Sequence, residues 1–424
     1  MLKGLNFSEL RQWFSQYAGV FILDFFSKCF GYLLLPLYLT YMTQNQFGTY
    51  TYIFYIITAA SNVFSLGFGT STCKLFNEYE ENRGSYLFSI NVFIFSFLGL
   101  VIGLSFLTRF DFYIMNLLIE DKGFQYENFR LSIIFYITYL VVYGQLSVYY
   151  QFTNQLKKFQ WVNLIRILVM NLIAIYYVKY ALFDKTATTR LNVEVILSWI
   201  IFLPLCYNYI KQFKIKFDWN PIKRSLIIGL PVIAASLASI FYTVSDKYFL
   251  QKNESIEVLA VYNLSLFLTT PLGFILTTFN LVWLPAFFRE KSIEVNFKRT
   301  KLICTILGIL FIAGSLFIGV IVYILVKFNG IPISYSNALI LFPFIVIAIT
   351  IEAFSQLLNN FIVMLESTWF TLVITLLIGG MMYFLSKWLV PEYGIKGTVS
   401  ILIFLSLFRF SSLLIYIKKR IYKY

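Results

Sequence analysis

Twelve long apolar segments follow one another along the 424 residues, and they constrain the fold more than any other feature. Each approaches the roughly 20 residues that an α-helix needs to cross a bilayer. The segments are Tyr17–Tyr41, Gly48–Gly69, Leu87–Leu107, Leu131–Tyr150, Trp161–Tyr180, Val193–Tyr209, Leu226–Leu250, Val258–Val282, Leu302–Val326, Ser336–Leu358, Phe361–Leu385 and Ile395–Ile417. The sequence therefore predicts an all-α integral membrane protein with about twelve transmembrane helices.

Composition leaves little room for a soluble part. Hydrophobic residues make up 59% of the chain and charged residues 13%, whereas a typical soluble domain has about 25% charged residues. The net charge of +14 lies mainly in short loops beside apolar segments, where membrane topology and anionic lipid headgroups explain it. We therefore expect contacts with membrane lipids and no binding of nucleic acid.

The Lys and Arg residues of the loops also predict an orientation. When the N-terminus is placed in the cytoplasm, the loops on its side carry about twice as many Lys and Arg residues as the opposite loops, as cytoplasmic loops usually do. This asymmetry favours an even number of spans with both termini in the cytoplasm.

A basic linker divides the chain near its middle. The stretch YIKQFKIKFDWNPIKRS separates the sixth and seventh apolar segments, and FGTYTY at Phe47–Tyr52 has a faint echo in LAVYNL at Leu259–Leu264. Secondary transporters often consist of two related halves with the substrate site between them. We predict two six-helix bundles, residues 1–210 and 226–424, joined by the cytoplasmic linker 211–225 around a central cavity.

Two opposite charges lie within the first apolar segment. Asp24 and Lys28 are four residues apart and therefore share one face of a helix. A charge at the centre of an inserted helix costs roughly 2.5–3.5 kcal/mol on insertion scales, so ionisable residues there usually face a protein interior or a water-filled cavity. The alternative is an ion pair that neutralises itself and has no further role.

Further charges lie in other segments. Asp246 completes a polar stripe on the seventh segment with Ser236, Ser239 and Thr243, although small hydroxyl residues also serve close helix packing. Glu352, Arg166 and Arg409 lie in the tenth, fifth and twelfth segments. Each is near enough to a helix end that its side chain could instead reach the headgroups.

Several classes of protein are excluded or disfavoured. The chain has no histidine, which excludes histidine metal sites and Ser-His or Cys-His catalysis. Its four cysteines form no CxxC pair, and there is no GxxxxGK[ST] or GxSxG motif. We therefore expect no metal, no cofactor and no catalytic residue, and we expect a transporter in preference to an enzyme.

Two stretches resemble a known family. The segment LPLYLTYMTQNQFGTYTYIFYIITAASNVFSLGFGTSTCKLF at Leu35–Phe76 is similar to the opening of the polysaccharide-biosynthesis flippases. These are the O-antigen and teichoic-acid type exporters of the multidrug/oligosaccharidyl-lipid/polysaccharide exporter superfamily. Asp246–Lys247, within Ser245–Asn263, is similar to the family's junction between the seventh and eighth helices.

The resemblance implies a function. It implies a flippase of the bacterial cytoplasmic (inner) membrane that moves a polyprenyl-pyrophosphate-linked oligosaccharide from the inner to the outer leaflet by alternating access, with other polysaccharide-assembly proteins as further partners. Lys28 and Arg166 would then bind the pyrophosphate, and Asp24, Asp246 and Glu352 would be candidates for binding a coupling proton or sodium ion. Whether the cycle uses an ion gradient stays open.

Two alternatives stay open as well. A drug or cation antiporter of the same superfamily would favour acidic cavity residues without paired cations, which Lys28 counts against. A membrane polysaccharide polymerase or ligase would usually carry a large external loop, and the longest external loop here, near Thr108–Arg130, is short.

Overall fold

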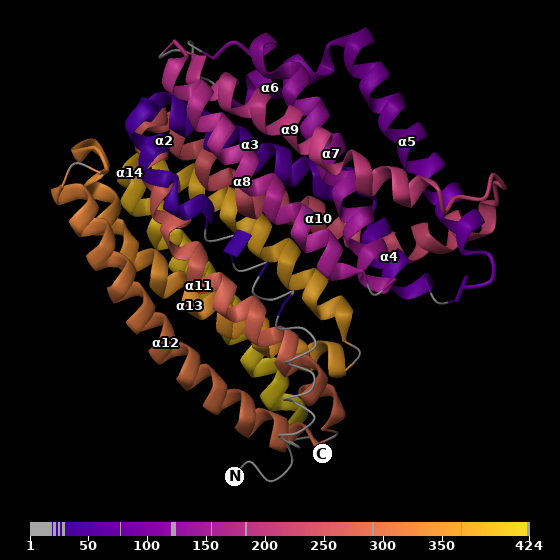
Figure 1. Ribbon diagram of the computed structural model, residues 1–424. Coiled ribbons are helices and arrows are strands. Elements are labelled where there is room, and N and C mark those ends of the chain that lie inside the picture. Colours follow the sequence, from indigo (N-terminus) through magenta and orange to yellow (C-terminus); the bar gives the residue numbers. More distant parts are fainter. Residues whose placement is uncertain are drawn as a thin grey trace.

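The computed structural model describes residues 19, 23, 26–27, 30–76, 78–119, 124–153, 155–182, 185–290, 292–328, 330–365 and 367–421, and these contain helices and no strand. Figure 1 shows two groups of helices, one formed by the first half of the chain and drawn in indigo to magenta, the other formed by the second half and drawn in orange to yellow. α5 and α12 lie on opposite flanks of the molecule.

The first half contributes eight described helices. They are α2 (Leu35–Tyr41), α3 (Gln44–Phe64), α4 (Phe68–Leu75), α5 (Arg83–Thr108), α6 (Phe110–Leu118), α7 (Glu127–Phe152), α8 (Leu156–Tyr180) and α9 (Thr186–Ile210). α8 packs along α9, and α3 packs against α7 and α9. α5 instead packs on α6 and on the first part of α10, so it diverges from its neighbours in this half.

The second half contributes the longest helices. They are α10 (Trp219–Asn253), α11 (Ile256–Arg289), α12 (Ile293–Lys327), α13 (Asn337–Met364) and α14 (Thr368–Ile421), with the short 3₁₀ helix η2 (Ile333–Tyr335) before α13. Asp218, Ser255 and Ser292 are the N-cap residues directly before α10, α11 and α12, and each side chain accepts a hydrogen bond from a backbone N–H of the first turn. These caps satisfy donors that a helix start leaves without a partner.

α14 folds back on itself. Its backbone breaks at Gly394, where φ is 53° and ψ is −134°. The rings of Phe370 and Tyr416, near its two ends, stack with centroids 4.1 Å apart, which a continuous helix of this length could not allow. The two arms therefore correspond to the eleventh and twelfth predicted segments.

Eight described helices are long and apolar enough to cross a membrane, or nine when the bent pair Trp219–Leu230 and Val232–Asn253 counts as one span. The predicted class, an all-α integral membrane protein, is confirmed. The count of twelve stays a prediction, because α14 counts once in this set and the first segment, Tyr17–Tyr41, is described only in part.

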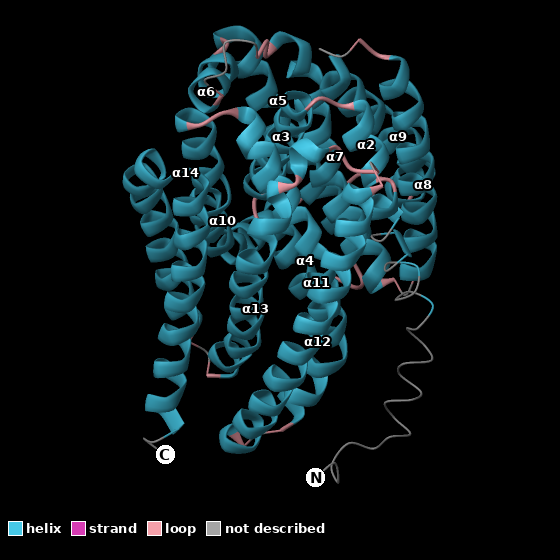
Figure 2. Cartoon of the chain, turned by 90° about the vertical axis from the view of Figure 1, so that its left-hand side faces the viewer, coloured by secondary structure: helices cyan, strands magenta, loops and turns pink. Residues whose placement is uncertain are grey.

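Two ends of the bundle matter below. Figure 2 shows α6 at one end, which we call the α6 end, and the last turn of α14 at the other. We call the second one the linker end, because residues 211–218 connect α9 to α10 there. α10 begins at Trp219, so helix already occupies much of the predicted linker 211–225.

Glycines allow the two halves to approach closely. At the α6 end, a Cβ added to Gly48 of α3 would lie 2.4 Å from the carbonyl oxygen of Ile256 in α11. Further toward the linker end, Gly67, with a φ of 66°, lies directly against Gly229 of α10, so that a Cβ on Gly67 would lie 2.8 Å from the carbonyl oxygen of Gly229. Any larger residue at Gly48 or Gly67 would separate these helices.

Candidate functional site

The first charged pair that the sequence singled out, Asp24 and Lys28, lies outside the described residues. Their predicted positions facing a cavity therefore stay predictions. The remaining predicted site residues, Arg166, Asp246 and Glu352, are all described and lie on three different helices, α8, α10 and α13.

Arg166 of α8 points into the interior of the first half, where its guanidinium meets neutral partners. It donates to Asn163 Oδ1 at 3.1 Å and to Ser198 Oγ at 3.2 Å. It also lies 5.7 Å from the ring centroid of Tyr139 and 5.8 Å from that of Phe202. No carboxylate among the described residues forms an ion pair with Arg166, so its charge is held by aromatic faces and dipoles.

A second buried cation of the first half is fully paired. Arg190 Nε of α9 donates to Glu194 Oε1 at 3.0 Å, one turn further along the same helix. The guanidinium lies between the rings of Tyr38 and Tyr50, 3.6 and 3.8 Å from their centroids. Tyr50 also donates its hydroxyl hydrogen to Glu194. This cluster joins α2, α3 and α9, and its pairing suits a structural role.

The predicted site residues do not include Arg190 or Glu194. The predicted sixth segment begins at Val193, whereas α9 begins at Thr186, so Arg190 lies within the helix. Most residues from Thr186 to Asn192 are polar, and hydropathy does not reveal a polar helical turn that is buried against other helices. The four-residue spacing that drew attention to Asp24 and Lys28 also relates Arg190 to Glu194 and could have identified them.

Asp246 and Lys247 form a buried pair near the α6 end of α10. Lys247 Nζ lies 3.2 Å from Asp246 Oδ1 and also donates to the carbonyl oxygen of Thr243 at 2.8 Å. Tyr262 of α11 donates to Asp246 Oδ2 at 2.7 Å. Lys247 lies 4.3 Å from the ring centroid of Tyr55 in α3, so the pair touches both halves of the chain.

The hydroxyls of the predicted stripe on α10 have ordinary partners. Ser239 Oγ donates to the carbonyl oxygen of Ser236, and Thr243 Oγ1 donates to that of Ser239. Such bonds within one helix satisfy a hydroxyl in an apolar setting. Of the stripe, only Asp246 brings a charge to the contact between the halves.

Glu352 of α13 pairs with Arg409 in the second arm of α14. The two side chains are 20% and 26% exposed, respectively. In this conformation Glu352 and Arg409 therefore pair with each other and do not extend separately to the lipid headgroups. Glu352 and Asp246 thus each have a cation as partner.

A line of contacts joins the halves at the α6 end, and we call it the α3 seam. Gln44 Nε2 donates to the carbonyl oxygen of Ser334 at 2.7 Å, and Asn45 Nδ2 donates to Glu257 Oε1 at 3.1 Å. Thr51 Oγ1 accepts from Asn263 Nδ2 at 2.9 Å. Between these bonds lies the close approach of Gly48 to Ile256 and Ala260. Among the described residues, no ion pair crosses this seam.

The buried charges of the two halves differ in whether they have a partner of opposite charge. The first half holds a cation without an acidic partner, Arg166, whereas the described acids of the second half that lie at depth are neutralised by Lys247 and Arg409. The described residues offer no group of three or more Cys, Asp and Glu side chains that could hold a metal ion. The arrangement suits binding of an anion more than binding of a metal or an organic cation.

Comparison with protein families settles the relationship. The family model described as "Polysaccharide biosynthesis protein" matches residues 18–291. This chain belongs to the polysaccharide biosynthesis protein family. In this family member, the match covers α2 to α11, the Asp246–Lys247 pair and every residue named in the α3 seam except Ser334. No curated protein sequence matches it significantly.

Solved structures show that this polysaccharide biosynthesis protein shares the fold of the MOP superfamily. An inward-facing multidrug resistance MATE family transporter superposes with a TM-score of 0.67 at 11% identity, with 96% of this chain and 95% of the other covered. A MOP superfamily transporter from Pyrococcus furiosus gives 0.64 at 12% identity, with the same coverage. The lipid II flippase MurJ in an inward closed conformation gives 0.62 at 17% identity, with 94% and 87% covered.

Proposed function

We propose that the chain is a flippase that moves a polyprenyl-pyrophosphate-linked oligosaccharide from the inner to the outer leaflet of a bacterial cytoplasmic membrane. A sugar headgroup cannot cross about 30 Å of hydrocarbon unaided. Membership of the polysaccharide biosynthesis family supports a lipid-linked glycan as the substrate. The fold shared with a lipid II flippase supports transport over synthesis.

The α3 seam is the observation that carries this proposal. Alternating access needs a contact that seals one end of the site and can be released without a large penalty. The seam consists of two hydrogen bonds between neutral groups and one from an amide to a carboxylate, with the close approach of Gly48 between them. Opening the seam would therefore break no buried ion pair among the described residues. With the orientation predicted from the loops, the seam would lie at the outer side of the membrane and would act as the outer gate.

Arg166 and Lys28 are the proposed ligands of the pyrophosphate. The positive charge of Arg166 is not compensated by a described carboxylate, because its partners are an amide, a hydroxyl and aromatic rings. A guanidinium also matches phosphate oxygens in geometry. The acids Asp246 and Glu352 are already paired with cations, which disfavours the alternative of a drug or cation antiporter that binds its substrate through them.

Replacing Arg166 with glutamine should reduce transport of the lipid-linked oligosaccharide about tenfold, because hydrogen bonds to charged groups are worth about 1.5–3 kcal/mol. Arg166→Lys keeps the charge and should retain more activity than Arg166→Gln. The measurement is translocation in proteoliposomes, read from the fraction of glycan that an external glycosidase can reach. Lys158→Gln, which removes an exposed cation from the same helix, is the control. Full transport by Arg166→Gln would remove this residue from the site.

The ion-coupling role of Asp24, Asp246 and Glu352 is a separate proposal. Because Asp246 and Glu352 have cations as partners in this state, a proton or sodium ion would bind them only after those cations move away. If the cycle is coupled, an ionophore that collapses the gradient should slow transport in the same proteoliposomes. Transport at an unchanged rate would exclude coupling and leave the flippase proposal intact.

A further inference from the structure

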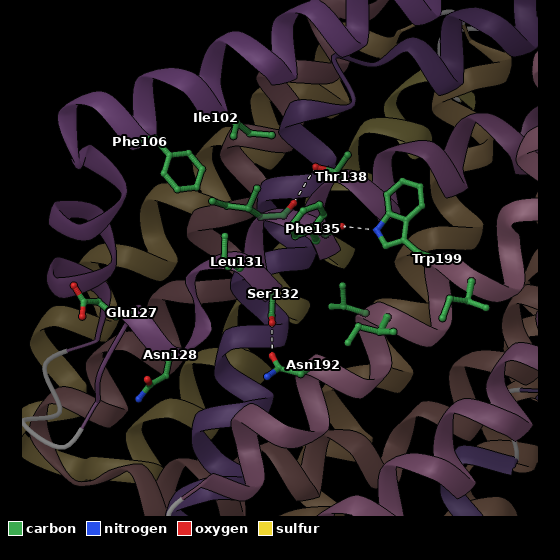
Figure 3. Close-up of a pocket in the computed structure, with 14 residues that line it drawn as sticks. Ile102, Phe106, Glu127, Asn128, Leu131, Ser132, Phe135, Thr138, Asn192 and Trp199 are labelled. Carbon is green, nitrogen blue, oxygen red and sulfur yellow. Dashed lines mark hydrogen bonds between the residues drawn. The ribbon is translucent and has the colours of Figure 1, made fainter.

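An apolar groove lies on the first half, between α5, α7 and α9, away from the contacts with the second half. Its volume is about 940 Å³. Figure 3 shows Ile102 and Phe106 of α5 on one side and Trp199 of α9 on the other, with Leu131 of α7 between them. Leu131 is 58% exposed, so the groove opens toward the surroundings of the helices and leaves an apolar surface uncovered.

The groove has the length of one leaflet. Its lining on α7 runs from Glu127 to Thr138, which corresponds to about 16 Å at a rise of 1.5 Å per residue. The hydrocarbon core is about 30 Å thick. A groove of this length spans about half of that thickness, which is the length that a lipid chain of one leaflet occupies.

A polar pocket of about 650 Å³ adjoins it at the α6 end. Amide and hydroxyl side chains make up most of its lining: Asn45, Gln46, Thr49, Gln125, Thr188 and Thr189. These groups can both donate and accept hydrogen bonds, as sugar hydroxyls do.

Aromatic rings and a single cation complete the polar pocket. Phe124 and Phe129 also line it, and their rings stack 5.2 Å apart at 23°, so the pocket has an aromatic wall against which a sugar ring can pack. Lys185 is the one charged side chain among the described lining residues, and no described carboxylate lines the pocket. The lining thus suits a glycan, neutral or with an anionic group.

The groove and the pocket meet at two residues that line both, Asn128 and Asn192. Asn192 accepts a hydrogen bond from Ser132 inside the groove, and Asn128 donates to Gln125 of the pocket at 3.1 Å. An occupant of both would have an apolar chain one leaflet long and a polar head at the membrane surface.

We propose that this two-part site binds the lipid-linked oligosaccharide after translocation, with the isoprenoid chain in the groove and the sugars nearest the pyrophosphate in the polar pocket. The site would lie in the outer leaflet when the loops are oriented as predicted. The groove would lie on the outer side of the first half, whereas the polar pocket borders the α3 seam at Asn45. The site would hold the product for the next assembly step. This inference rests on the proposed flippase function.

The test uses the full chain in lipid nanodiscs and a photoreactive probe, polyprenyl-pyrophosphate-linked N-acetylglucosamine with a benzophenone in its isoprenoid chain. Cross-linked peptides should come from α5, α7 and α9. Leu131→Trp should fill the groove and reduce this labelling about tenfold, which corresponds to about 1.4 kcal/mol. Leu172→Trp is the matched control, because Leu172 is a similarly exposed leucine, at 55%, on α8 outside both pockets.

A second variant tests the sugar pocket. Thr188→Val/Thr189→Val removes two hydroxyls at nearly constant volume and should weaken labelling by the sugar-bearing probe several-fold. The same isoprenoid pyrophosphate without sugar should label this variant as it labels the wild type.

Three outcomes would overturn the site: equal labelling of the groove by photoreactive phosphatidylglycerol, unchanged labelling in Leu131→Trp, or cross-links only to a co-purified protein. Transport, measured separately in proteoliposomes, distinguishes the two proposals. Normal transport without groove labelling would reject the exit site alone, whereas no transport of any lipid-linked glycan would reject the flippase function.

Discussion

Replacing Gly48 with alanine is expected to reduce transport about tenfold while the protein still folds. The new Cβ would lie 2.4 Å from the carbonyl oxygen of Ile256 and 3.2 Å from the Cβ of Ala260, so α3 and α11 could not keep their present contact. Forcing a methyl group into a packed contact costs about 1–3 kcal/mol. A penalty of 1.4 kcal/mol on the closed seam changes the ratio of closed to open states tenfold.

The change in conformation can be measured directly. Spin labels at Tyr180 of α8 and Ile333 of η2, which are 69% and 77% exposed, report the separation of the halves at the α6 end in a cysteine-free background. Their distance distribution should shift to longer values in Gly48→Ala. Transport should fall because a carrier that cannot close this end does not complete its cycle.

Gly99→Ala is the matched control, since a Cβ at Gly99 of α5 meets no atom within 4 Å. Alanine also favours a helix over glycine by about 1 kcal/mol, so neither variant should lose helical stability. Wild-type transport and an unchanged distance distribution in Gly48→Ala would show that the seam is not the gate.

Replacing Asp246 with alanine is expected to destabilise the protein strongly, by about 3 kcal/mol. Removing one partner of a buried ion pair leaves the other charge without compensation, and such losses are typically about 3–5 kcal/mol. The side chains of Asp246 and Lys247 are 2% and 5% exposed. Tyr262 would also lose the acceptor of its 2.7 Å hydrogen bond. The apparent melting temperature in detergent should therefore fall.

Removing both charges should restore much of that loss. In Asp246→Ala/Lys247→Met no isolated charge remains, so the double variant should melt above Asp246→Ala. The exposed pair Arg224–Glu78, with side chains 50% and 43% exposed, gives the control: Glu78→Ala should cost less than about 1 kcal/mol. A double variant that melts no higher than Asp246→Ala would show that charge isolation is not the cause.

The helices themselves were predictable, because hydropathy is a local property of the chain. The segment Leu87–Leu107 lies within α5, and Leu302–Val326 lies within α12, helices that turn much of their surface outward. The prediction was wrong where a helix turns a polar face toward other helices. α9 begins seven residues before Val193, since the polar residues of its first turns pack inside the protein.

The pairing of charges was only partly predictable. Arg190 and Glu194 are one turn apart on one helix, and Asp246 and Lys247 are adjacent, so their spacing is visible in the chain. Arg409 and Glu352 are separated by 57 residues and meet only because the second arm of α14 packs on α13. Sequence spacing could not relate them.

The sequence by itself determined the class of the protein, an all-helical membrane protein, because the length and hydropathy of each segment fix whether it can cross a bilayer. It also carried enough of the opening pattern to indicate the polysaccharide biosynthesis family. Only the tertiary structure decided which charges are compensated and where the halves touch. The contact of Arg166 with Ser198, the rings around Arg190 and the approach of Gly48 to Ile256 come from residues far apart in the chain, and no local property of the sequence encodes the distance between them.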